Sequence, residues 1–247
     1  MLFKKIINKI CNLKIIDKRH LYKYYEQEHL KRLLSHLEVD CVFDIGANNG
    51  QYATMLRREV GYNGLIISFE PNPAAAAVAR KKAQDDDMWI VEEMAVSTSD
   101  GYQTFHVMND SQFSSLSKPK HDEIDAFKTG NAVMEAIQVK TETLTSAYER
   151  LSKKYRFKRP FLKMDTQGFD VAIVSHAGPA LSHFLGLQSE LAVMKLYDHS
   201  TDYKEALKLY EDCGFQMSAF APNNSGNFPD LVETDCIMIR KIKTLTK

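Results

Sequence analysis

The amino-acid sequence predicts an α/β fold of the Rossmann-like kind, with helices on both faces of a mainly parallel sheet. Short apolar runs alternate with amphipathic segments between residues 39 and 212, and this alternation produces βαβ units and a parallel sheet. The end of the chain departs from the pattern, because Phe215–Phe220 and Asp235–Arg240 both read as strands joined only by the loop Pro222–Leu231. These two strands predict an antiparallel edge. The 247 residues suffice for one well-buried domain.

The first half of the domain has clear local signals. Val39–Ile45 is a short apolar run that ends at a glycine turn, so it is the first predicted strand. A helix follows it, because apolar residues recur at helical spacing at Tyr52, Met55, Leu56 and Val60. Leu65–Phe69 is the second strand, and Asn72 is placed to cap the next helix with Pro73 at its first position. Met88–Glu92 reads as the third strand.

The middle of the chain changes character. Tyr102–Met108 alternates like a strand, but residues 109–136 are polar and poorly periodic, which predicts a lid or an excursion over the active face. Regular patterns then return. They predict strands at 137–140, 161–164 and 186–193, and helices at 144–153, 171–175 and 203–212, the last closed by Gly214.

Residues 1–38 are predicted to form a helical extension ahead of the domain 39–247. Leu2, Phe3, Ile6, Ile7 and Ile10 fall at helical spacing with lysines between them. Such a helix suits residues 1–20 to a membrane surface or a partner, to the chain's own domain, or to a second copy in a homodimer. The lysines break up any signal-peptide core, and no apolar run approaches about 18 residues. We therefore expect a cytoplasmic protein, at most peripheral to the inner face of the membrane.

The composition excludes several classes of protein. The formal net charge is zero, so no overall field attracts the chain to nucleic acid. Its four cysteines, Cys11, Cys41, Cys213 and Cys236, have no C-x-x-C spacing and no histidines at zinc-site spacing. We expect reduced thiols and no metal site of this kind. A divalent metal at the reacting site is compatible with the sequence, but nothing indicates one.

A glycine-rich loop, Asp44–Gln51, follows the first predicted strand. Gly46 and Gly50 permit a tight turn and the close approach of a ligand to the backbone. A dinucleotide site has the pattern G-x-G-x-x-G, whose second glycine admits a pyrophosphate, but here Asn48 stands at that position. The loop also begins with Asp44, an acid suited to a cationic ligand group.

Glu70 closes the second strand, where an acid accepts hydrogen bonds from two ribose hydroxyls. S-adenosylmethionine has a ribose, an ammonium and a sulfonium but no phosphate, so Asp44, the side-chain amides of the loop and Glu70 favour it as the ligand. Two alternatives stay open. A nicotinamide-dependent oxidoreductase would place Glu70 in the same way, and a non-catalytic binding module could have the same fold.

Several stretches resemble FkbM-type methyltransferases, namely Val42–Tyr52, Phe69–Pro73 and Phe161–Asp170. The resemblance extends in order over roughly residues 40–240, although 117–136 and the first 38 residues have no clear match. It implies a seven-stranded class I methyltransferase fold, S-adenosylmethionine as cofactor and methylation of oxygen, with polyketide and sugar hydroxyls as acceptor types. Asp170 stands where the family usually has Glu.

The same resemblance places an adenine-edge turn at Ala95–Ser97 and a small serine motif at Ser114–Leu116, and Glu190 and Glu233–Ile237 also fit. The residues expected to contact the cofactor are Asp44, Gly46, Ala47, Asn48, Gly50, Glu70, Pro71, Ala95, Ser115 and Asp165. Because bacterial members often modify surface polysaccharides, the favoured acceptor is a sugar hydroxyl of a glycan, with a small natural product as the alternative.

The reacting groups are expected at the ends of the later strands. Side chains alternate along a strand, so Lys163 and Asp165 point the same way, and a lysine within an apolar strand requires a partner. Glu190 lies near the end of the next strand, close enough to share a cleft with Asp165. We predict that Asp165 or Glu190 is the general base and that Lys163 orients them or holds the substrate. The alternative is a buried structural ion network. His199 is a further candidate for base or substrate contact.

Overall fold

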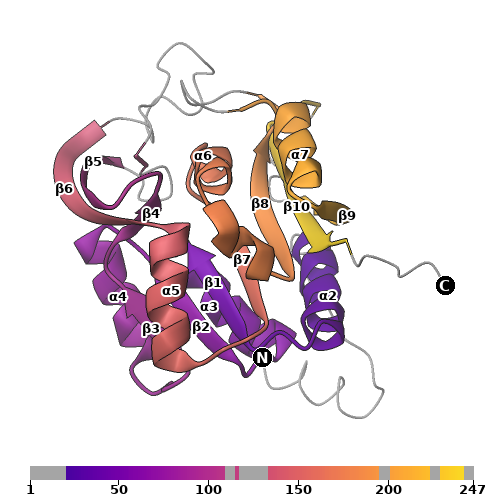
Figure 1. The fold of residues 1–247 in the computed structure, drawn as a ribbon, viewed down its shortest axis with the longest axis horizontal. Coiled ribbons are helices and arrows are strands. Elements are labelled where there is room, and N and C mark those ends of the chain that lie inside the picture. Colours follow the sequence, from indigo (N-terminus) through magenta and orange to yellow (C-terminus); the bar gives the residue numbers. More distant parts are fainter. Residues whose placement is uncertain (1–20, 109–114, 117–132, 195–200, 223–228, 242–247) are drawn as a thin grey trace.

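The computed structural model describes residues 21–108, 115–116, 133–194, 201–222 and 229–241. Its centre is a seven-stranded sheet in the order β3-β2-β1-β7-β8-β10-β9 (Figure 1). The strands are β1 Cys41–Ile45, β2 Leu65–Phe69, β3 Trp89–Glu92, β7 Pro160–Met164, β8 Gly186–Ala192, β9 Phe215–Ala221 and β10 Glu233–Arg240. All neighbours pair in parallel except β10, which is antiparallel to both β8 and β9. The predicted fold class and its antiparallel edge are confirmed.

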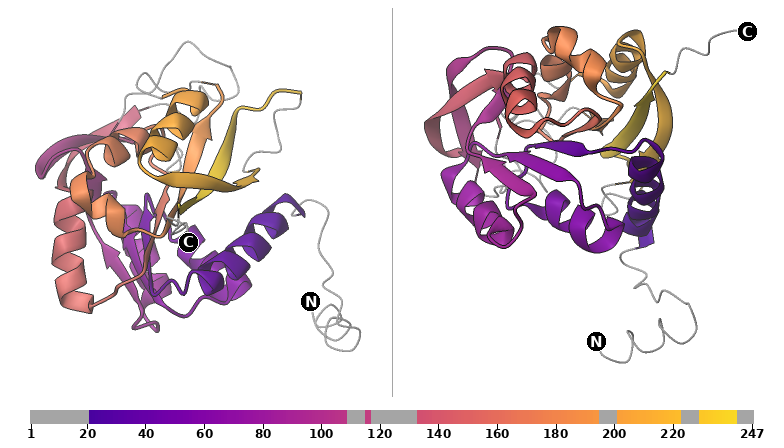
Figure 2. Two further views of the ribbon diagram at one scale, coloured as in Figure 1. Left: turned by 45° about the vertical axis from the view of Figure 1, so that its right-hand side comes forward. Right: turned by 60° about the horizontal axis from the view of Figure 1, so that its bottom comes forward.

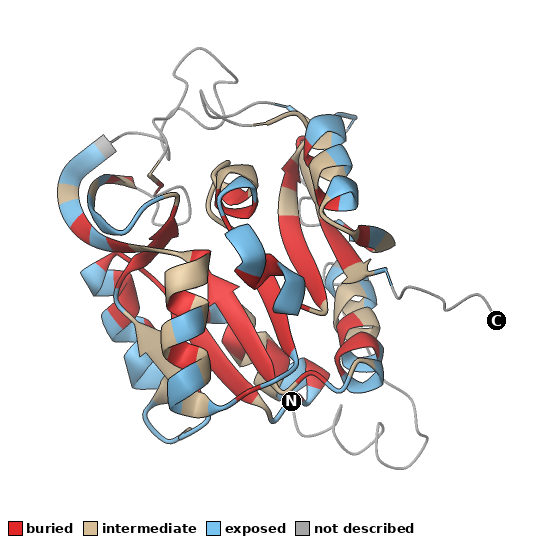
Figure 3. Ribbon diagram, in the orientation of Figure 1, coloured by how far each residue is buried: buried red, intermediate tan, exposed pale blue. Residues whose placement is uncertain are grey.

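Helices cover both faces of this sheet (Figure 2). They are α2 Leu21–His36, α3 Gln51–Met55 continuing into a π-helical turn at Leu56–Val60, α4 Pro73–Ala83, α5 Leu144–Tyr155, α6 Asp170–Ser175 followed by a 3-10 turn at Gly178–His183, and α7 Tyr203–Asp212. Helices α5, α6 and α7 bury their apolar sides with Phe43, while α2 and α3 pack with Val42 on the other face. Because successive side chains of a strand point to opposite faces, β1 is buried throughout (Figure 3).

Local capping signals explain where several helices begin and end. Asn72 Oδ1 accepts a hydrogen bond from the Ala74 N–H at 3.0 Å, and Pro73 is the first residue of α4, as predicted. At the end of α7, Gly214 has a φ of 87° and its N–H donates to the Glu211 carbonyl. The predicted bounds of β2 and α7 are confirmed.

A second, three-stranded sheet was not foreseen as a unit. It has the order β4-β6-β5, from β4 Ala95–Ser97, β5 Gly101–Met108 and β6 Val133–Thr143. The prediction placed the strand at residues 137–140 and extended the irregular segment to 136. In the structure the strand begins at Val133, because β5 pairs with it along nearly its whole length. Most of the predicted lid, residues 109–114 and 117–132, lies outside the described residues.

The predicted N-terminal extension is helical where the structure describes it. Helix α2 buries Leu30, Leu33 and Leu34 against the domain, whereas residues 1–20 lie outside the described part. Among the described residues, no helix has the length and apolar character needed to cross a bilayer. Three of the four cysteines are described, and Cys41, Cys213 and Cys236 are free thiols.

Candidate active site

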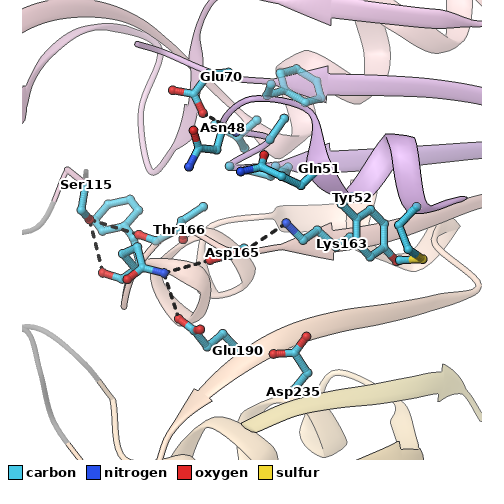
Figure 4. A pocket seen from close by; sticks show the side chains of 18 of the residues that line it. Asn48, Gln51, Tyr52, Glu70, Ser115, Lys163, Asp165, Thr166, Glu190 and Asp235 are labelled. Atoms are coloured by element: carbon cyan, nitrogen blue, oxygen red, sulfur yellow. Dashed lines mark hydrogen bonds and ion pairs between the residues drawn. The ribbon is translucent and has the colours of Figure 1, made fainter. Parts of the chain in front are cut away.

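A cavity of about 890 Å³ opens beyond the carboxyl ends of β1, β2, β7 and β8 (Figure 4). The antiparallel β10 begins at the same edge, because its Asp235 pairs with Glu190 of β8. Residues from both halves of the sheet therefore surround one space. This is where ligands bind in open parallel sheets.

Hydrogen bonds to Phe69 and Glu70 and within the loop hold the glycine loop in its turn. The N–H groups of Gly46 and Ala47 both donate to the Phe69 carbonyl at 3.0 Å, and the Gly50 N–H donates to Ala47. The Asn48 N–H donates to Glu70 Oε2 at 2.7 Å. A diphosphate needs free N–H groups at such a loop, and these four are engaged within the protein.

The two glycines of the loop form the predicted turn and also make room for protein atoms. Both have left-handed backbones, with φ of 78° at Gly46 and 73° at Gly50, so the tight turn is confirmed. A Cβ at Gly46, however, would lie 1.9 Å from the carbonyl oxygen of Asp165, and one at Gly50 would lie 2.7 Å from the ring of Trp89. Protein atoms, rather than a ligand, make the close approach. Gly46 thus joins the loop directly to the end of β7.

Glu70 lines the cavity and is fixed by two backbone donors. The Asn72 N–H donates to its Oε1 at 2.8 Å, and the Asn48 N–H occupies one site on Oε2. Each oxygen keeps a further acceptor position. Burial raises the pKa of Glu70 to about 7, although the two backbone hydrogen bonds oppose the rise. The carboxyl is therefore placed to accept hydrogen bonds from a ligand in the cavity.

Asp44 does not line the cavity, which corrects its expected contact with the cofactor. Its side chain is fully buried, where Ser68 Oγ donates to Oδ2 at 2.9 Å and Lys163 Nζ lies 3.4 Å from Oδ1. Lys163 also lies 3.5 Å from Asp165 Oδ2, on the same side of β7 as expected. Burial alone would lower the pKa of Lys163, but Asp165 and Asp44 outweigh it and raise that pKa. Lys163 is consequently held as a cation.

One wall of the cavity comes from the small sheet. Ala95 and Val96 line the cavity as part of the buried strand β4, where a turn was expected at the adenine edge. Ser115 lines it as well, but its hydroxyl donates to the carbonyls of Thr166 and Gln167 at 3.1 and 3.3 Å. Ser115 therefore supports the turn that follows β7.

Asp165 and Glu190 meet in the cavity through a residue that the sequence analysis did not single out. Gln167 Nε2 donates to Asp165 Oδ1 at 2.9 Å and to Glu190 Oε2 at 3.2 Å. Burial, then the charges of Glu233 and Asp165, raises the pKa of Glu190 well above its ordinary value. Gln167 adopts a φ of 53°, a left-handed conformation that is uncommon outside glycine.

Asp170 fixes the turn that follows β7. Its Oδ1 accepts from the Thr166 N–H at 2.9 Å and from the Thr166 hydroxyl, while Oδ2 accepts from Ser189 Oγ at 2.8 Å and the Glu190 N–H at 3.2 Å. One buried carboxyl thereby ties the end of β7 to the end of β8.

Gln188, a buried residue of β8 that holds cavity-lining side chains in place, also escaped the sequence analysis. It donates through Nε2 to Glu26 and Asp235 and accepts from the Tyr52 hydroxyl, all at 2.8 Å. The signal that could have found it was the one that found Lys163, a polar residue inside an apolar strand. His199 lies outside the described residues. Within the ranges that the structure describes, no three His, Cys, Asp or Glu side chains are grouped to hold a metal ion.

Comparison with known proteins yields a family match over most of the domain. The model of the methyltransferase FkbM domain matches residues 44–217. No curated protein matches the chain.

Similar solved structures include magnesium protoporphyrin IX methyltransferase from Synechocystis PCC 6803, at TM-score 0.48 and 10% identity over 97% of this chain and 96% of that one. Fibrillarin from Aeropyrum pernix aligns at TM-score 0.44 and 14% identity, covering 88% of this chain and 76% of that one. An rRNA methylase from Streptococcus thermophilus aligns at TM-score 0.44 and 10% identity, covering 87% and 94%.

Proposed function

Because the chain belongs to the FkbM family of S-adenosylmethionine-dependent methyltransferases, we propose that it methylates a hydroxyl group of a sugar in a glycan, with a small natural product as the alternative acceptor. The observation that carries the proposal is that Asp165 and Glu190 face the same cavity as Glu70. The candidate general bases for a hydroxyl and the carboxyl group suited to a ribose thus line one cavity.

The half of the cavity lined by the glycine loop, Glu70 and β4, which we call the cofactor half, fits a nucleoside without phosphates. The free acceptor positions of Glu70 suit ribose hydroxyls, and the N–H groups of Gly46, Ala47, Asn48 and Gly50 are already engaged within the protein rather than offered to a diphosphate. Ala95 and Val96 of β4 give an apolar wall for a base. When bound, S-adenosylmethionine supplies an electrophilic methyl group on a positively charged sulfur.

Glu190 is the favoured general base. Its raised pKa gives a carboxylate that is basic enough to accept the proton of an acceptor hydroxyl. Asp165, bridged to it by Gln167, orients the same hydroxyl or takes its proton in its place. Lys163 offsets the negative charge of Asp165 and Asp44 and, being held protonated, does not act as a base. The remaining catalytic effect would come from alignment of the reacting groups.

We infer a small-molecule or glycan acceptor rather than nucleic acid, since the chain carries no net charge. Residues 1–20 are proposed to contact a membrane surface, a partner or a second copy of the chain. These roles are consistent with a cytoplasmic enzyme that works where glycans are assembled.

The experiment is incubation of the protein with methyl-labelled S-adenosylmethionine and a panel of glycans, sugar nucleotides and phenolic natural products. We expect label on a hydroxyl oxygen of a carbohydrate. Glu190→Gln and Asp165→Asn should bind the cofactor within about twofold of the wild type, and loss of the base should lower turnover by roughly 100-fold to 10,000-fold. Label on nitrogen or carbon, or full turnover in both variants, would remove these acids from the mechanism.

A further inference from the structure

Helix α2 forms one wall of the cavity, although it precedes the stretch that matches the family model. It is anchored by Leu30, which is fully buried, and by a 2.9 Å hydrogen bond between His29 Nε2 and Ser218 Oγ of β9. From this fixed position α2 presents Lys23, Glu26 and Gln27 to the cavity. Helix α2 packs against β9 and Glu26 is bonded to Gln188 of β8, so these residues lie on the side of β1 opposite Glu70, with the strands β7, β8 and β10. They therefore lie in the half of the cavity away from Glu70, which we call the acceptor half because the cofactor is assigned to the other half.

Glu26 is held in place by a buried amide. Gln188, which is 1% exposed, donates to Glu26 Oε1 at 2.8 Å and to Asp235 Oδ2 at 2.8 Å. The Tyr52 hydroxyl donates to the other end of the amide and so fixes its orientation. Glu26 Oε2 has no hydrogen-bond partner among the residues that the structure describes. One carboxylate oxygen is thus preorganised to accept a hydrogen bond from a ligand.

The charge of this half is negative. The carboxyl groups that line it are Glu26, Asp165, Glu190, Glu233 and Asp235. Lys163, the buried cation at this end, already contacts Asp44 and Asp165, while Lys23 and Arg58 are exposed at the rim.

Burial raises the pKa of Glu26, Glu190 and Asp235, which shows that these carboxyl groups are poorly solvated. Ligand groups that donate hydrogen bonds fit this wall, whereas an anionic group would meet the like charge of the lining carboxylates.

We propose that Glu26 determines acceptor specificity and that this half of the cavity takes a neutral or positively charged polyol and rejects one bearing carboxylate or phosphate. This inference rests on the proposed function, because it assigns the half to the acceptor. It adds a residue outside the family match and a charge rule for the acceptor. Glu26 accepts a hydrogen bond from the acceptor through Oε2. Gln188, which donates to Oε1, is its positioning residue.

The test uses three matched probes that differ in charge: methyl glucoside, methyl glucosaminide and methyl glucuronide. Each is titrated into protein saturated with S-adenosylhomocysteine, and the affinity is measured by calorimetry. We expect the neutral and amine probes to bind about tenfold or more tightly than the uronide. Glu26→Gln should weaken the neutral probe by roughly 5-fold to 20-fold and narrow the gap to the uronide, with the affinity for S-adenosylhomocysteine unchanged.

Glu28→Gln is the matched control, since Glu28 lies on the same helix but does not line the cavity. It removes the same charge and should behave as the wild type. Equal or tighter binding of the uronide, binding of none of the probes, or an unchanged Glu26→Gln variant would overturn the inference. Binding in the expected order without methyl transfer to any carbohydrate would leave the charge rule standing and count against the proposed function alone.

Discussion

Replacing Glu70 by glutamine should weaken binding of S-adenosylmethionine and remove its pH dependence. In the wild type both oxygens already accept a backbone N–H, at 2.7 and 2.8 Å, and the side chain is only 6% exposed. Glutamine keeps one acceptor and turns an NH₂ group towards the second backbone donor. A charge-assisted hydrogen bond contributes about 1.5–3 kcal/mol, so loss of one ribose contact, together with the charge assistance to the other, should raise Kd by at least about 10-fold at pH 8.

The pH dependence follows from the raised pKa of Glu70, about 7. A ribose hydroxyl donates to the ionised carboxyl, so binding favours the deprotonated form and releases a proton below that pKa. The ionised fraction falls from about nine-tenths at pH 8 to about one-tenth at pH 6, which should raise Kd about tenfold over that range. Calorimetry at pH 6, 7 and 8 measures this slope. Glu70→Gln should show none of it.

Glu190→Gln serves as the control, because the pKa of Glu190 is also raised but its carboxyl lies in the acceptor half. That variant should keep the tenfold slope. A wild-type Kd that does not change between pH 6 and 8 would refute the role given to Glu70. The same slope in Glu70→Gln would show that another group carries the titration.

Three further predictions concern stability. Between pH 4.5 and about 7, folded Glu70 holds its proton more tightly than the unfolded chain, so in urea unfolding the wild type should lose about 3 kcal/mol more stability than Glu70→Gln as pH rises through that window; an equal loss in both would contradict this. Lys163→Met leaves the fully buried Asp44 without its counter-ion and should lower the free energy of unfolding by about 3–5 kcal/mol, part of which Asp44→Asn in the same chain should restore; a Lys163→Met variant as stable as the wild type would contradict this. Gly46→Ala should cost more than about 3 kcal/mol or prevent folding, whereas Gly61→Ala, at φ 76° with no atom within 4 Å of its Cβ, should cost about 1 kcal/mol; equal losses in thermal unfolding would refute the assigned contact with Asp165.

The sequence predicted best the elements whose signals are local. Strand β2 was bounded correctly because its apolar run stops at Glu70 and the capping residue Asn72 follows. The small sheet was missed as a unit because its pairing is not local. Ala95 of β4 lies beside Thr141 of β6, far along the chain, and three-residue strands carry no periodicity.

The sequence predicted the site residues whose type alone demands an explanation, such as a charge inside an apolar strand. It did not predict residues whose role depends on which neighbours the fold brings beside them. Lys163 and Glu70 were found because a charge at a strand end or inside a strand needs a reason. The packing role of Gly46 was not predicted, since only the pairing of β1 with β7 brings the Asp165 carbonyl against it. Gln167 gave no sequence signal, because an uncharged amide on a turn is ordinary until two carboxylates flank it.

A polar row crosses the sheet beneath the cavity and explains why its two halves form one site. Ser68, Asp44, Lys163 and Gln188 stand side by side in register on β2, β1, β7 and β8. Trp89 Nε1 donates to Ser68 Oγ at one end, and Gln188 donates to Glu26 and Asp235 at the other. Because a buried polar group without a partner is costly, each member constrains the next. The carboxyls that face the acceptor are therefore positioned by the same row that runs under the cofactor loop, and a substitution such as Lys163→Met should disturb both halves together.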